Sequence, residues 1–371
     1  MSKELRFQLG DYPSSVIIQE NIPRLEELYP GAGEGGKDGG PGALLVCDEN
    51  TAPLARRVSG DLPLTTLPPG EEHKGWKAVE TILRDARRGG LGRDGLFIGV
   101  GGGAVCDLTA FAASIYMRGA ALRLIPTTLL CVVDAALGGK TGFDLGGIKN
   151  LAGTFYPAER IVIALEALET LPPREWKSGA AELIKAAVLD GDAAFLERLQ
   201  RPFTGPGGTP SSLEALVPLL ERALTVKGRI VEADPREQFD GETGGGRILL
   251  NLGHTFGHAL EAALGLGTIS HGEAVAWGLA RSLDLGAALG ITPPGRETAI
   301  REVLEAWGYE TAVPYPGGDA GFDRRFREAL ENDKKKKAGK PRFVVPGARG
   351  ARVVPWSLEV EACLYSLLSK R

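Results

Sequence analysis

The stretch Leu-Phe-Ile-Gly-Val-Gly-Gly-Gly-Ala-Val-Cys-Asp, residues 96–107, joins a short apolar run to a string of glycines. The apolar run is typical of a strand buried in a parallel sheet, and the glycines open a predicted helix. Backbone amides in such a turn can approach a pyrophosphate, and the helix N-terminus adds a favourable partial charge. The stretch therefore predicts a strand–turn–helix unit that binds a dinucleotide, although the glycine string alone fits a plain tight turn equally well.

Similar apolar runs recur around this unit, and helical patterns lie between them. Strands are predicted at 43–47, 96–100, 122–125 and 161–164, with helices at 76–87 and 107–117. From about residue 174 helical periodicity dominates, with helices predicted at 175–190, 212–232, 249–264, 272–289 and 297–307. Because prolines end elements, Pro172-Pro173 is the predicted boundary. We expect an α/β, Rossmann-like NAD-binding domain at 1–172 and a mostly α-helical, metal-binding domain at 173–371.

Composition excludes several classes of protein. The chain has 371 residues, with 43% hydrophobic and 24% charged residues, as in ordinary globular proteins. A net charge of −4 argues against a nucleic-acid or acidic-membrane partner. No apolar run is long enough to cross a membrane, and residues 1–6 lack an apolar signal core, so we expect a cytoplasmic protein. The four cysteines form no close pair and are expected to be reduced and buried.

Several cations stand alone among small or apolar residues instead of on charged surfaces. Since solvated lysines usually have charged neighbours, these cations predict a site for a small anionic ligand. They are Arg118, Lys140, Lys149, Lys185, Lys227 and Arg247.

Three of the four histidines fall within eighteen residues, at 254, 258 and 271. On a helix, His254 and His258 share one face, and His271 can fold back toward them if the chain turns near Gly265 and Gly267. This arrangement predicts a metal site. Thr255 stands where a zinc protease motif requires Glu, so that class is excluded, and a carboxylate ligand must come from elsewhere.

Two further segments carry candidate cofactor ligands. Asp48 ends a predicted strand and can accept both hydroxyls of a ribose, which favours NAD over NADP because an acid repels a ribose phosphate. In the usual dinucleotide fingerprint the acid follows the glycines, whereas here it precedes them. Glu71 and Lys74 lie in a loop that can reach the adenosine side of the cofactor, or that is simply a solvated turn.

Taken together, the motifs resemble those of the 3-dehydroquinate synthase family of sugar-phosphate cyclases, in the family's order over roughly residues 44–345. The matching segments are Gly101-Gly102-Gly103 with Asp107, Tyr116-Met117-Arg118-Gly119, Pro126-Thr127-Thr128-Leu129-Leu130, Gly138-Gly139-Lys140-Thr141-Gly142, Lys149-Asn150, Ala181-Glu182-Leu183-Ile184-Lys185, Asn251-Leu252-Gly253-His254-Thr255-Phe256-Gly257-His258 and His271-Gly272-Glu273-Ala274-Val275.

The resemblance implies a homodimeric, phosphate-eliminating lyase of the shikimate pathway, with zinc or cobalt held by Glu182, His254 and His271. Its substrate would be 3-deoxy-D-arabino-heptulosonate 7-phosphate. NAD would oxidise a ring hydroxyl, phosphate would be eliminated, and the same cofactor would reduce the ketone before ring closure to 3-dehydroquinate. The spacing agrees, because two imidazoles and one carboxylate leave open metal positions, and Glu182 and Lys185 share a helical face.

The resemblance also assigns roles to the remaining candidates. His258 would transfer protons, and one lysine of Lys334 to Lys336 would reach the substrate. The other residues implied at the substrate are Lys140, Lys185, Asn150, Arg118, Asp134, Lys227, Arg247 and Asn251. Those implied at the cofactor are Asp48, Glu71, Lys74, Gly101, Gly102, Gly103, Asp107, Thr127, Thr128, Lys149 and Thr170.

The chain departs from the family pattern at two places. Ala135 and Ala136 follow Asp134 where the family commonly carries two serines, and residues 238–246 lengthen the spacing between Glu237 and Arg247. These departures leave three alternatives: a cyclase that makes a cyclitol such as 2-deoxy-scyllo-inosose or 2-epi-5-epi-valiolone, a metal-dependent alcohol dehydrogenase of the glycerol dehydrogenase type, and a non-catalytic NAD-binding regulator. Lys227, Arg247 and Asn251 favour dehydroquinate synthase, because cyclitol precursors lack the carboxylate that this set would bind.

Overall fold

The computed structural model describes residues 2–29, 42–201, 203, 205, 209–239, 245–265, 267–312, 321–336 and 342–369. The chain folds as two compact units. The first comprises Met1–Pro172 together with Ser212–Leu224, and the second comprises Pro173–Ser211 together with Thr225–Arg371. The segment Ser212–Leu224, which lies beyond the predicted boundary, is thus grouped with the first unit.

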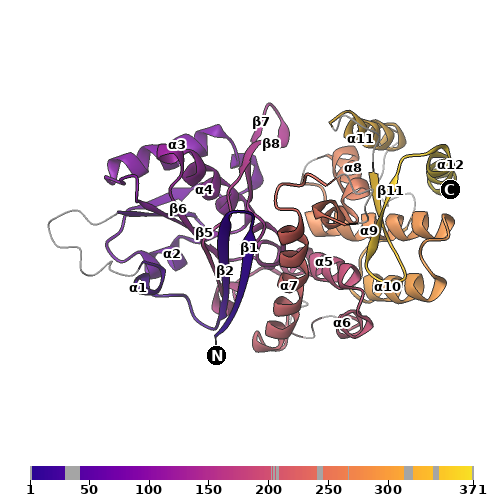
Figure 1. Ribbon diagram of the computed structural model, residues 1–371, viewed down its shortest axis with the longest axis horizontal. Helices are drawn as coiled ribbons and strands as arrows, with labels where there is room; N and C mark the ends of the chain where they lie inside the picture. Colours follow the sequence, from indigo (N-terminus) through magenta and orange to yellow (C-terminus); the bar gives the residue numbers. More distant parts are fainter. Residues whose placement is uncertain are drawn as a thin grey trace. The chain divides into compact units, whose positions relative to one another are not determined.

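The first unit is built on a seven-stranded sheet in the order β1-β2-β9-β6-β5-β3-β4 (Figure 1). Every neighbouring pair is parallel except the edge pair β1–β2. The strands are β1 (Lys3–Leu9), β2 (Tyr12–Gln19), β3 (Ala43–Asp48), β4 (Leu64–Leu67), β5 (Leu96–Gly101), β6 (Ala121–Pro126) and β9 (Arg160–Ala164).

Helices cover both faces of this sheet, as expected of strands that are apolar throughout. Leu45 and Ile98 point to a core that includes side chains of α1 (Leu25–Leu28) and α2 (Ala52–Ser59). The opposite face is covered by α4 (Gly103–Ile115), because a Cβ on Gly99 would lie 3.1 Å from Thr109 Oγ1 of that helix. The helix α3 (Trp76–Arg88) packs beside α4, and Figure 1 shows α2 and α3 on different sides of the strands.

A second, smaller β element belongs to the same unit. The strands β7 (Lys140–Leu145) and β8 (Ile148–Phe155) form an antiparallel hairpin that packs on α4 through Phe143 and Phe111, whose ring centroids are 5.0 Å apart. The short connecting turns are η1 (Glu71–His73), η2 (Tyr116–Arg118), a π-helical turn η3 (Cys131–Ala135) and η4 (Leu165–Leu168).

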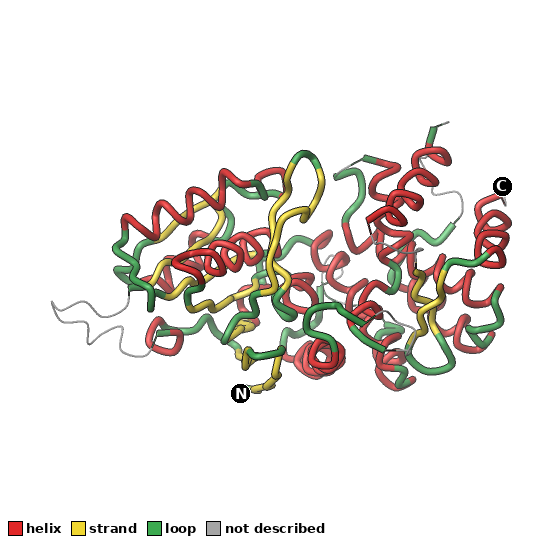
Figure 2. Tube along the Cα trace, turned by 45° about the horizontal axis from the view of Figure 1, so that its top comes forward, coloured by secondary structure: helices red, strands yellow, loops and turns green. Residues whose placement is uncertain are grey.

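The second unit is mostly helical, with one short hairpin formed by β10 (Arg342–Pro346) and β11 (Ala351–Pro355) (Figure 2). Phe256, Trp277, Phe326 and Phe343 fill its core. Its elements are α5 (Pro173–Asp190), α6 (Ala193–Arg198), η7 (Arg247–Asn251), α8 (His254–Leu264), α9 (His271–Ala288), α10 (Pro294–Ala306), α11 (Phe322–Lys336) and α12 (Leu358–Ser369). The turn η6 (Glu214–Leu216) lies in the first unit, and α7 (Val217–Ala233) begins there and ends in the second.

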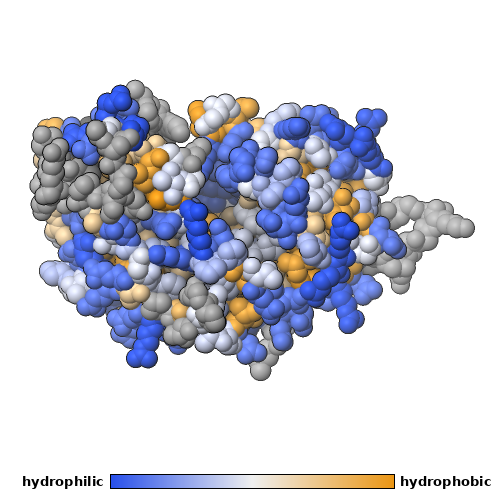
Figure 3. All heavy atoms as spheres, turned by 180° about the vertical axis from the view of Figure 1, so that it is seen from behind, coloured by the Kyte–Doolittle hydropathy of each residue, from blue (hydrophilic) through white to orange (hydrophobic). Residues whose placement is uncertain are grey.

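The predicted fold class is confirmed: an α/β unit with a largely parallel sheet precedes a mostly helical one. Three strands of the sheet, β1, β2 and β4, and the two hairpins were not predicted from the sequence. Within the described residues no helix is both long and apolar enough to cross a membrane. The face drawn in Figure 3 is mainly hydrophilic, with small separate hydrophobic areas.

Candidate active site

Glu182, His254 and His271 meet in the second unit, although they are contributed by three different helices. Glu182 lies in the middle of α5 and is 2% exposed, while His254 and His271 are the first residues of α8 and α9. One ligand atom from each lies within 4.8 Å of the other two. The structure therefore brings together the three predicted metal ligands.

The distances within this cluster fit a shared metal ion better than hydrogen bonds. Glu182 Oε1 lies 3.6 Å from His254 Nε2 and 3.8 Å from His271 Nε2. Ligand atoms about 3.4 Å apart are expected around a tetrahedral ion with bonds of about 2.1 Å. Glu182 Oε1 is buried and accepts no hydrogen bond from the described residues, an arrangement that costs stability unless something binds the oxygen. A divalent cation is the group that these three atoms fit.

Neighbouring groups fix the tautomer of His254 and the position of His271. The carbonyl oxygen of Leu252 lies 3.1 Å from His254 Nδ1, and because a carbonyl only accepts, Nδ1 carries the proton and Nε2 presents its lone pair to the cluster. His271 is held by a capping box, in which Ser270 Oγ accepts from the Glu273 amide and Glu273 Oε2 accepts from the Ser270 amide at 2.8 Å.

Two glycines allow the ligand-bearing helices to approach one another. A Cβ on Gly272 would lie 2.1 Å from the Ser178 carbonyl oxygen of α5, and a Cβ on Gly278 would lie 2.0 Å from the Gly253 oxygen that precedes α8. The Gly272 amide also donates to Ser178 Oγ at 3.1 Å. These approaches set the spacing of α5, α8 and α9, and with it the spacing of the three ligands.

Predicted substrate residues also lie near the triad. Lys185 Nζ is 2.5 Å from Glu182 Oε2, and Lys185 is 3% exposed. His258 follows His254 by one turn, and their ring centroids are 5.3 Å apart. The other oxygen of Glu182 is thus anchored by a cation, and a third imidazole lies beside the triad.

In the first unit, the glycine turn stands at the point where the strand order reverses. From β3 the chain continues to β4 on one side and then to β5 on the other, and ligands of open α/β sheets bind at the carboxyl ends of such strands. Because Cys47 pairs with Val100, Asp48 and Gly101 end adjacent strands. Although Asp48 precedes the glycines in the sequence, it therefore lies beside them at the carboxyl edge of the sheet, where a ribose-binding acid is expected.

Asp48 is held in place at this edge. Its Oδ1 accepts hydrogen bonds from the amide and hydroxyl of Thr51, at 2.8 and 2.9 Å, and the same hydroxyl contacts the Val100 carbonyl oxygen. The helix α4 begins directly after the glycines, with Gly102 as its N-cap. A Cβ on Gly103 would meet nothing closer than Ala135 Cβ at 3.6 Å, so packing within the protein does not require a glycine there. The free space fits the close approach of a ligand.

Lys74 organises a second cluster in the first unit. This lysine is 4% exposed, and its Nζ donates to Asp107 Oδ2 at 2.7 Å and to Asn150 Oδ1 at 2.6 Å, with Glu71 Oε1 at 3.6 Å. Burial alone would lower the pKa of Lys74, but the charges of Asp107 and Glu71 outweigh burial and raise it. Burial raises the pKa of Asp107 to about 6 against the opposing effect of Lys74. Predicted cofactor residues thus contact Asn150, which the sequence analysis assigned to the substrate.

The remaining predicted residues are placed as follows. The Thr127 amide donates to the Gly101 carbonyl oxygen at 3.0 Å, and Thr128 Oγ1 accepts from the Cys131 amide.

Lys140 lines a small hollow with Asp107, Ala135 and Ala136, and Asp134 lies in η3 directly before these alanines. Lys149 is exposed on β8. In the described part of the chain, the exposed residues Arg118 and Thr170 form no hydrogen bond or ion pair with the other candidates.

Three more candidates lie in the second unit. Lys227 on α7 and Arg247 on η7 are 7% and 4% exposed, and Arg247 donates to the Pro235 carbonyl oxygen at 3.0 Å. Asn251 ends η7, three residues before His254. The side chains of Lys334 to Lys336, and residues 240–244 of the predicted insertion, lie outside the described residues.

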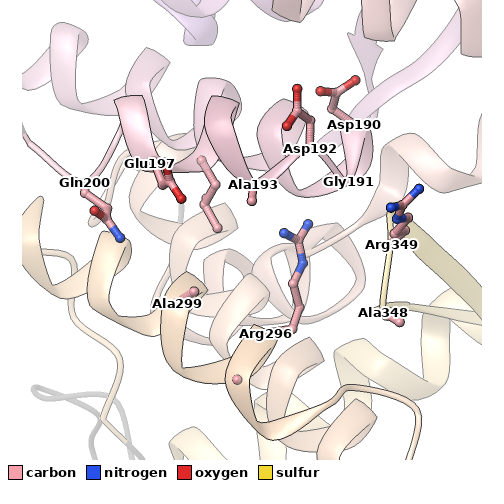
Figure 4. Close-up of a pocket in the computed structure, with 12 residues that line it drawn as sticks. Asp190, Gly191, Asp192, Ala193, Glu197, Gln200, Arg296, Ala299, Ala348 and Arg349 are labelled. Carbon is pink, nitrogen blue, oxygen red and sulfur yellow. The ribbon is translucent and has the colours of Figure 1, made fainter.

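A cavity of about 670 Å³ lies elsewhere in the second unit, among α5, α6, α10 and the β10–β11 turn (Figure 4). Figure 4 shows Asp190, Asp192 and Glu197 on one side of it, with Arg296 and Arg349 on the other. Of the predicted site residues whose side chains the structure describes, none lines this cavity. The triad, where ligand chemistry and spacing agree, is therefore the better candidate for an active site.

The sequence analysis missed residues that support the triad. Ser270 and Glu273 have the Ser-x-x-Glu spacing of a capping box, which is a readable signal. Glu261 lies on α8 with its Oε1 3.8 Å from His271 Nδ1, and it follows His254 by two helical turns. That spacing places Glu261 on the face of His254, but its relation to His271 depends on how the two helices pack.

Comparisons with known proteins agree with this geometry. Residues 64–178 match the family model described as 3-dehydroquinate synthase N-terminal, and residues 179–336 match the one described as 3-dehydroquinate synthase C-terminal. The two matches together span the glycine turn and all three residues of the triad.

Solved structures with the same fold include two cyclases. A 2-deoxy-scyllo-inosose synthase complexed with carbaglucose-6-phosphate, NAD+ and Co2+ is 22% identical, with 99% of each chain covered and a TM-score of 0.80. A 2-epi-5-epi-valiolone synthase from Streptomyces hygroscopicus with NAD+ and Zn2+ is 24% identical over 98% of this chain and 99% of that one, with a TM-score of 0.75. A probable glycerol dehydrogenase from Sinorhizobium meliloti is 17% identical, covering 95% and 96% of the two chains, with a TM-score of 0.59.

Proposed function

Because the chain belongs to the 3-dehydroquinate synthase family, we propose that it is a 3-dehydroquinate synthase. It would convert 3-deoxy-D-arabino-heptulosonate 7-phosphate to 3-dehydroquinate and phosphate, a step of the shikimate pathway, using catalytic NAD and a divalent metal. The observation that carries the proposal is the buried Glu182 oxygen, which accepts no hydrogen bond and faces two imidazole nitrogens at metal-ligand spacing.

The metal would be held by Glu182 Oε1 and the Nε2 atoms of His254 and His271. When bound, a divalent ion lowers the pKa of a ligated alcohol and polarises the carbonyl that replaces it. The solved 2-deoxy-scyllo-inosose synthase holds Co2+ and the 2-epi-5-epi-valiolone synthase holds Zn2+, which supports either ion here. NAD, which is bound in both of those structures, would bind here at the carboxyl ends of β3 and β5, with its pyrophosphate at Gly101 to Gly103 and a ribose at Asp48.

The protein's own side chains would bind and orient the substrate. Lys185, which already contacts Glu182, would face the substrate oxygens, and His258 would move protons one helical turn from a metal ligand. The buried cations Lys227 and Arg247 would hold the substrate carboxylate. This last role favours dehydroquinate synthase over cyclitol-forming relatives, whose substrates lack that carboxylate.

The test is phosphate release from 3-deoxy-D-arabino-heptulosonate 7-phosphate with NAD at a concentration far below that of the substrate. We expect many turnovers for each NAD, no accumulation of NADH, and loss of activity after chelation that added Zn2+ or Co2+ restores. Glucose 6-phosphate, which has no carboxylate, serves as the matched substrate. Turnover of glucose 6-phosphate alone would replace the proposal by a cyclitol synthase, and stoichiometric NADH would replace it by a dehydrogenase.

A further inference from the structure

The His271 ring lies between two carboxylates, one at each nitrogen. Its Nε2 is 3.8 Å from Glu182 Oε1 in the triad, and its Nδ1 is 3.8 Å from Glu261 Oε1 on α8. Glu261 is 14% exposed in its side chain and is not a member of the triad. It also lies in a second cluster with His258 and His271, whose ligand atoms are all within 4.8 Å of one another.

On the side away from the triad, each of the two histidines faces an oxygen, which lies at 3.1 Å from His254 Nδ1 and at 3.8 Å from His271 Nδ1. His254 Nδ1 faces the Leu252 carbonyl oxygen, and His271 Nδ1 faces the Glu261 carboxylate. Both groups accept hydrogen bonds, so both favour the tautomer with the proton on Nδ1 and the lone pair on Nε2, toward the triad. A carboxylate behind a ligand imidazole also orients the ring and makes it a stronger donor to the metal.

We propose that Glu261 is a positioning residue of the metal centre, which holds His271 in its ligand tautomer and orientation. The inference rests on the proposed metal-dependent function and deepens it. The 3.8 Å gap between His271 Nδ1 and Glu261 Oε1 can close to a hydrogen bond by small side-chain rotations, because both side chains are partly exposed and can adjust.

The same three residues, His258, Glu261 and His271, could instead hold a second cation. That arrangement would require His271 to bind one ion through each nitrogen, and its ring would then have to lose both protons. A neutral imidazole keeps one N–H, and a carboxylate at Nδ1 satisfies it without any such loss. The positioning role is therefore the one that the geometry favours.

The experiment measures the affinity of the apoprotein for Zn2+ by competition with a chromogenic chelator, and the visible absorption of bound Co2+, both without substrate. For Glu261→Leu we expect roughly a 10- to 100-fold loss of Zn2+ affinity and an altered Co2+ spectrum, the usual effect of removing an outer partner. Glu261→Gln keeps an oxygen that can accept from Nδ1–H and should restore most of the affinity. Glu297→Leu on α10, a partly buried glutamate paired with Arg301, is the matched control and should leave affinity unchanged.

Unchanged affinity and spectrum in Glu261→Leu would overturn the inference while leaving the proposed function intact. Two Zn2+ equivalents in the wild type and one in Glu261→Leu would overturn it in favour of a second cation site. Weakened Zn2+ binding in Glu261→Leu, together with no phosphate release by the wild type, would support the inference and remove the proposed function. Circular dichroism of each apoprotein confirms that the variants fold before metal is added.

Discussion

Lys74 in the first unit and Glu182 in the second are both buried, charged side chains, but their surroundings differ. Lys74 Nζ donates to Asp107 and Asn150 and lies near Glu71, so the protein itself supplies its partners. Glu182 has Lys185 at one oxygen, while the other oxygen faces two imidazole nitrogens at distances too long for hydrogen bonds.

The Lys74 cluster is therefore complete within the protein, whereas the Glu182 triad leaves room for a bound cation. An unsatisfied buried oxygen costs about 1–3 kcal/mol of stability, and among the described residues nothing satisfies Glu182 Oε1. The Lys74 cluster should therefore contribute to folding in the free protein, whereas the triad should matter chiefly when metal is present.

The largest effect is expected from removing a metal ligand. His271→Ala should abolish turnover. It should also lower Zn2+ affinity by more than roughly 100-fold, which is the upper effect of removing a residue that only hydrogen-bonds a metal ligand. His258→Ala is the matched variant from the same imidazole group, and it should keep the metal yet slow turnover by about 10²- to 10⁴-fold. Zn2+ competition and phosphate release measure the two effects. Full activity in His258→Ala would disprove its role in proton transfer.

Removing Lys74 should break the complete cluster. Lys74→Met leaves Asp107 buried without its cation, and losing one member of a buried ion pair costs about 3 kcal/mol or more. Hydrogen exchange of amides in α3 and α4 should become faster, while Zn2+ affinity in the second unit should not change. Lys77→Met, at an exposed position on α3, is the control and should have little effect. Equal exchange in both variants would mean that the cluster contributes nothing to folding.

The raised pKa of Asp107 predicts how stability depends on pH. Because its pKa is about 6 in the folded protein and 3.8 in the unfolded chain, the folded state binds the proton more tightly. The contribution to stability is therefore fully present below about pH 4 and is lost as the pH rises through 6, by up to about 3 kcal/mol. Asp107→Asn should remove this slope between pH 4.5 and 7.5 in urea unfolding of the apoprotein. Parallel curves for the two proteins would refute the assignment.

Zn2+ affinity should also fall when a residue outside the triad is changed. In Gly272→Ala, the new methyl group would collide with the Ser178 carbonyl oxygen and push α9 away from α5, at a cost of about 1–3 kcal/mol. Zn2+ affinity should fall with it, since His271 precedes this glycine. Gly295→Ala on α10, where a Cβ meets nothing within 4 Å, is the control for stability and for metal binding. Normal Zn2+ affinity in Gly272→Ala would show that helix spacing does not control the site.

Much of this organisation could be predicted from the sequence, and the exceptions have physical causes. The predicted helix at 175–190 agrees with Pro173–Asp190, and that at 272–289 agrees with His271–Ala288, because both stretches are rich in alanine and leucine, which favour helices. Histidine spacing alone indicated a metal site, but Glu182 is 72 residues before His254 and was found only through family resemblance. The adjacency of Asp48 and the glycine turn depends on strand order, and the position of Glu261 depends on helix packing, neither of which is local in sequence.

The smallest effect concerns the glycine turn and tests whether it is shaped by packing or by a cofactor. A Cβ fits at Gly103 but would lie 2.6 Å from Val105 Cβ at Gly101, so the two glycines should respond differently to alanine. Gly103→Ala should stabilise the free protein by up to about 1 kcal/mol, because alanine favours a helix. It should also weaken NAD binding at least roughly tenfold, because the methyl group would occupy space that the cofactor needs. Gly101→Ala should instead destabilise the free protein. NAD binding by Gly103→Ala is measured by isothermal titration calorimetry. Normal affinity would mean that glycine at 103 is not needed for the approach of a cofactor and that the pyrophosphate binds elsewhere.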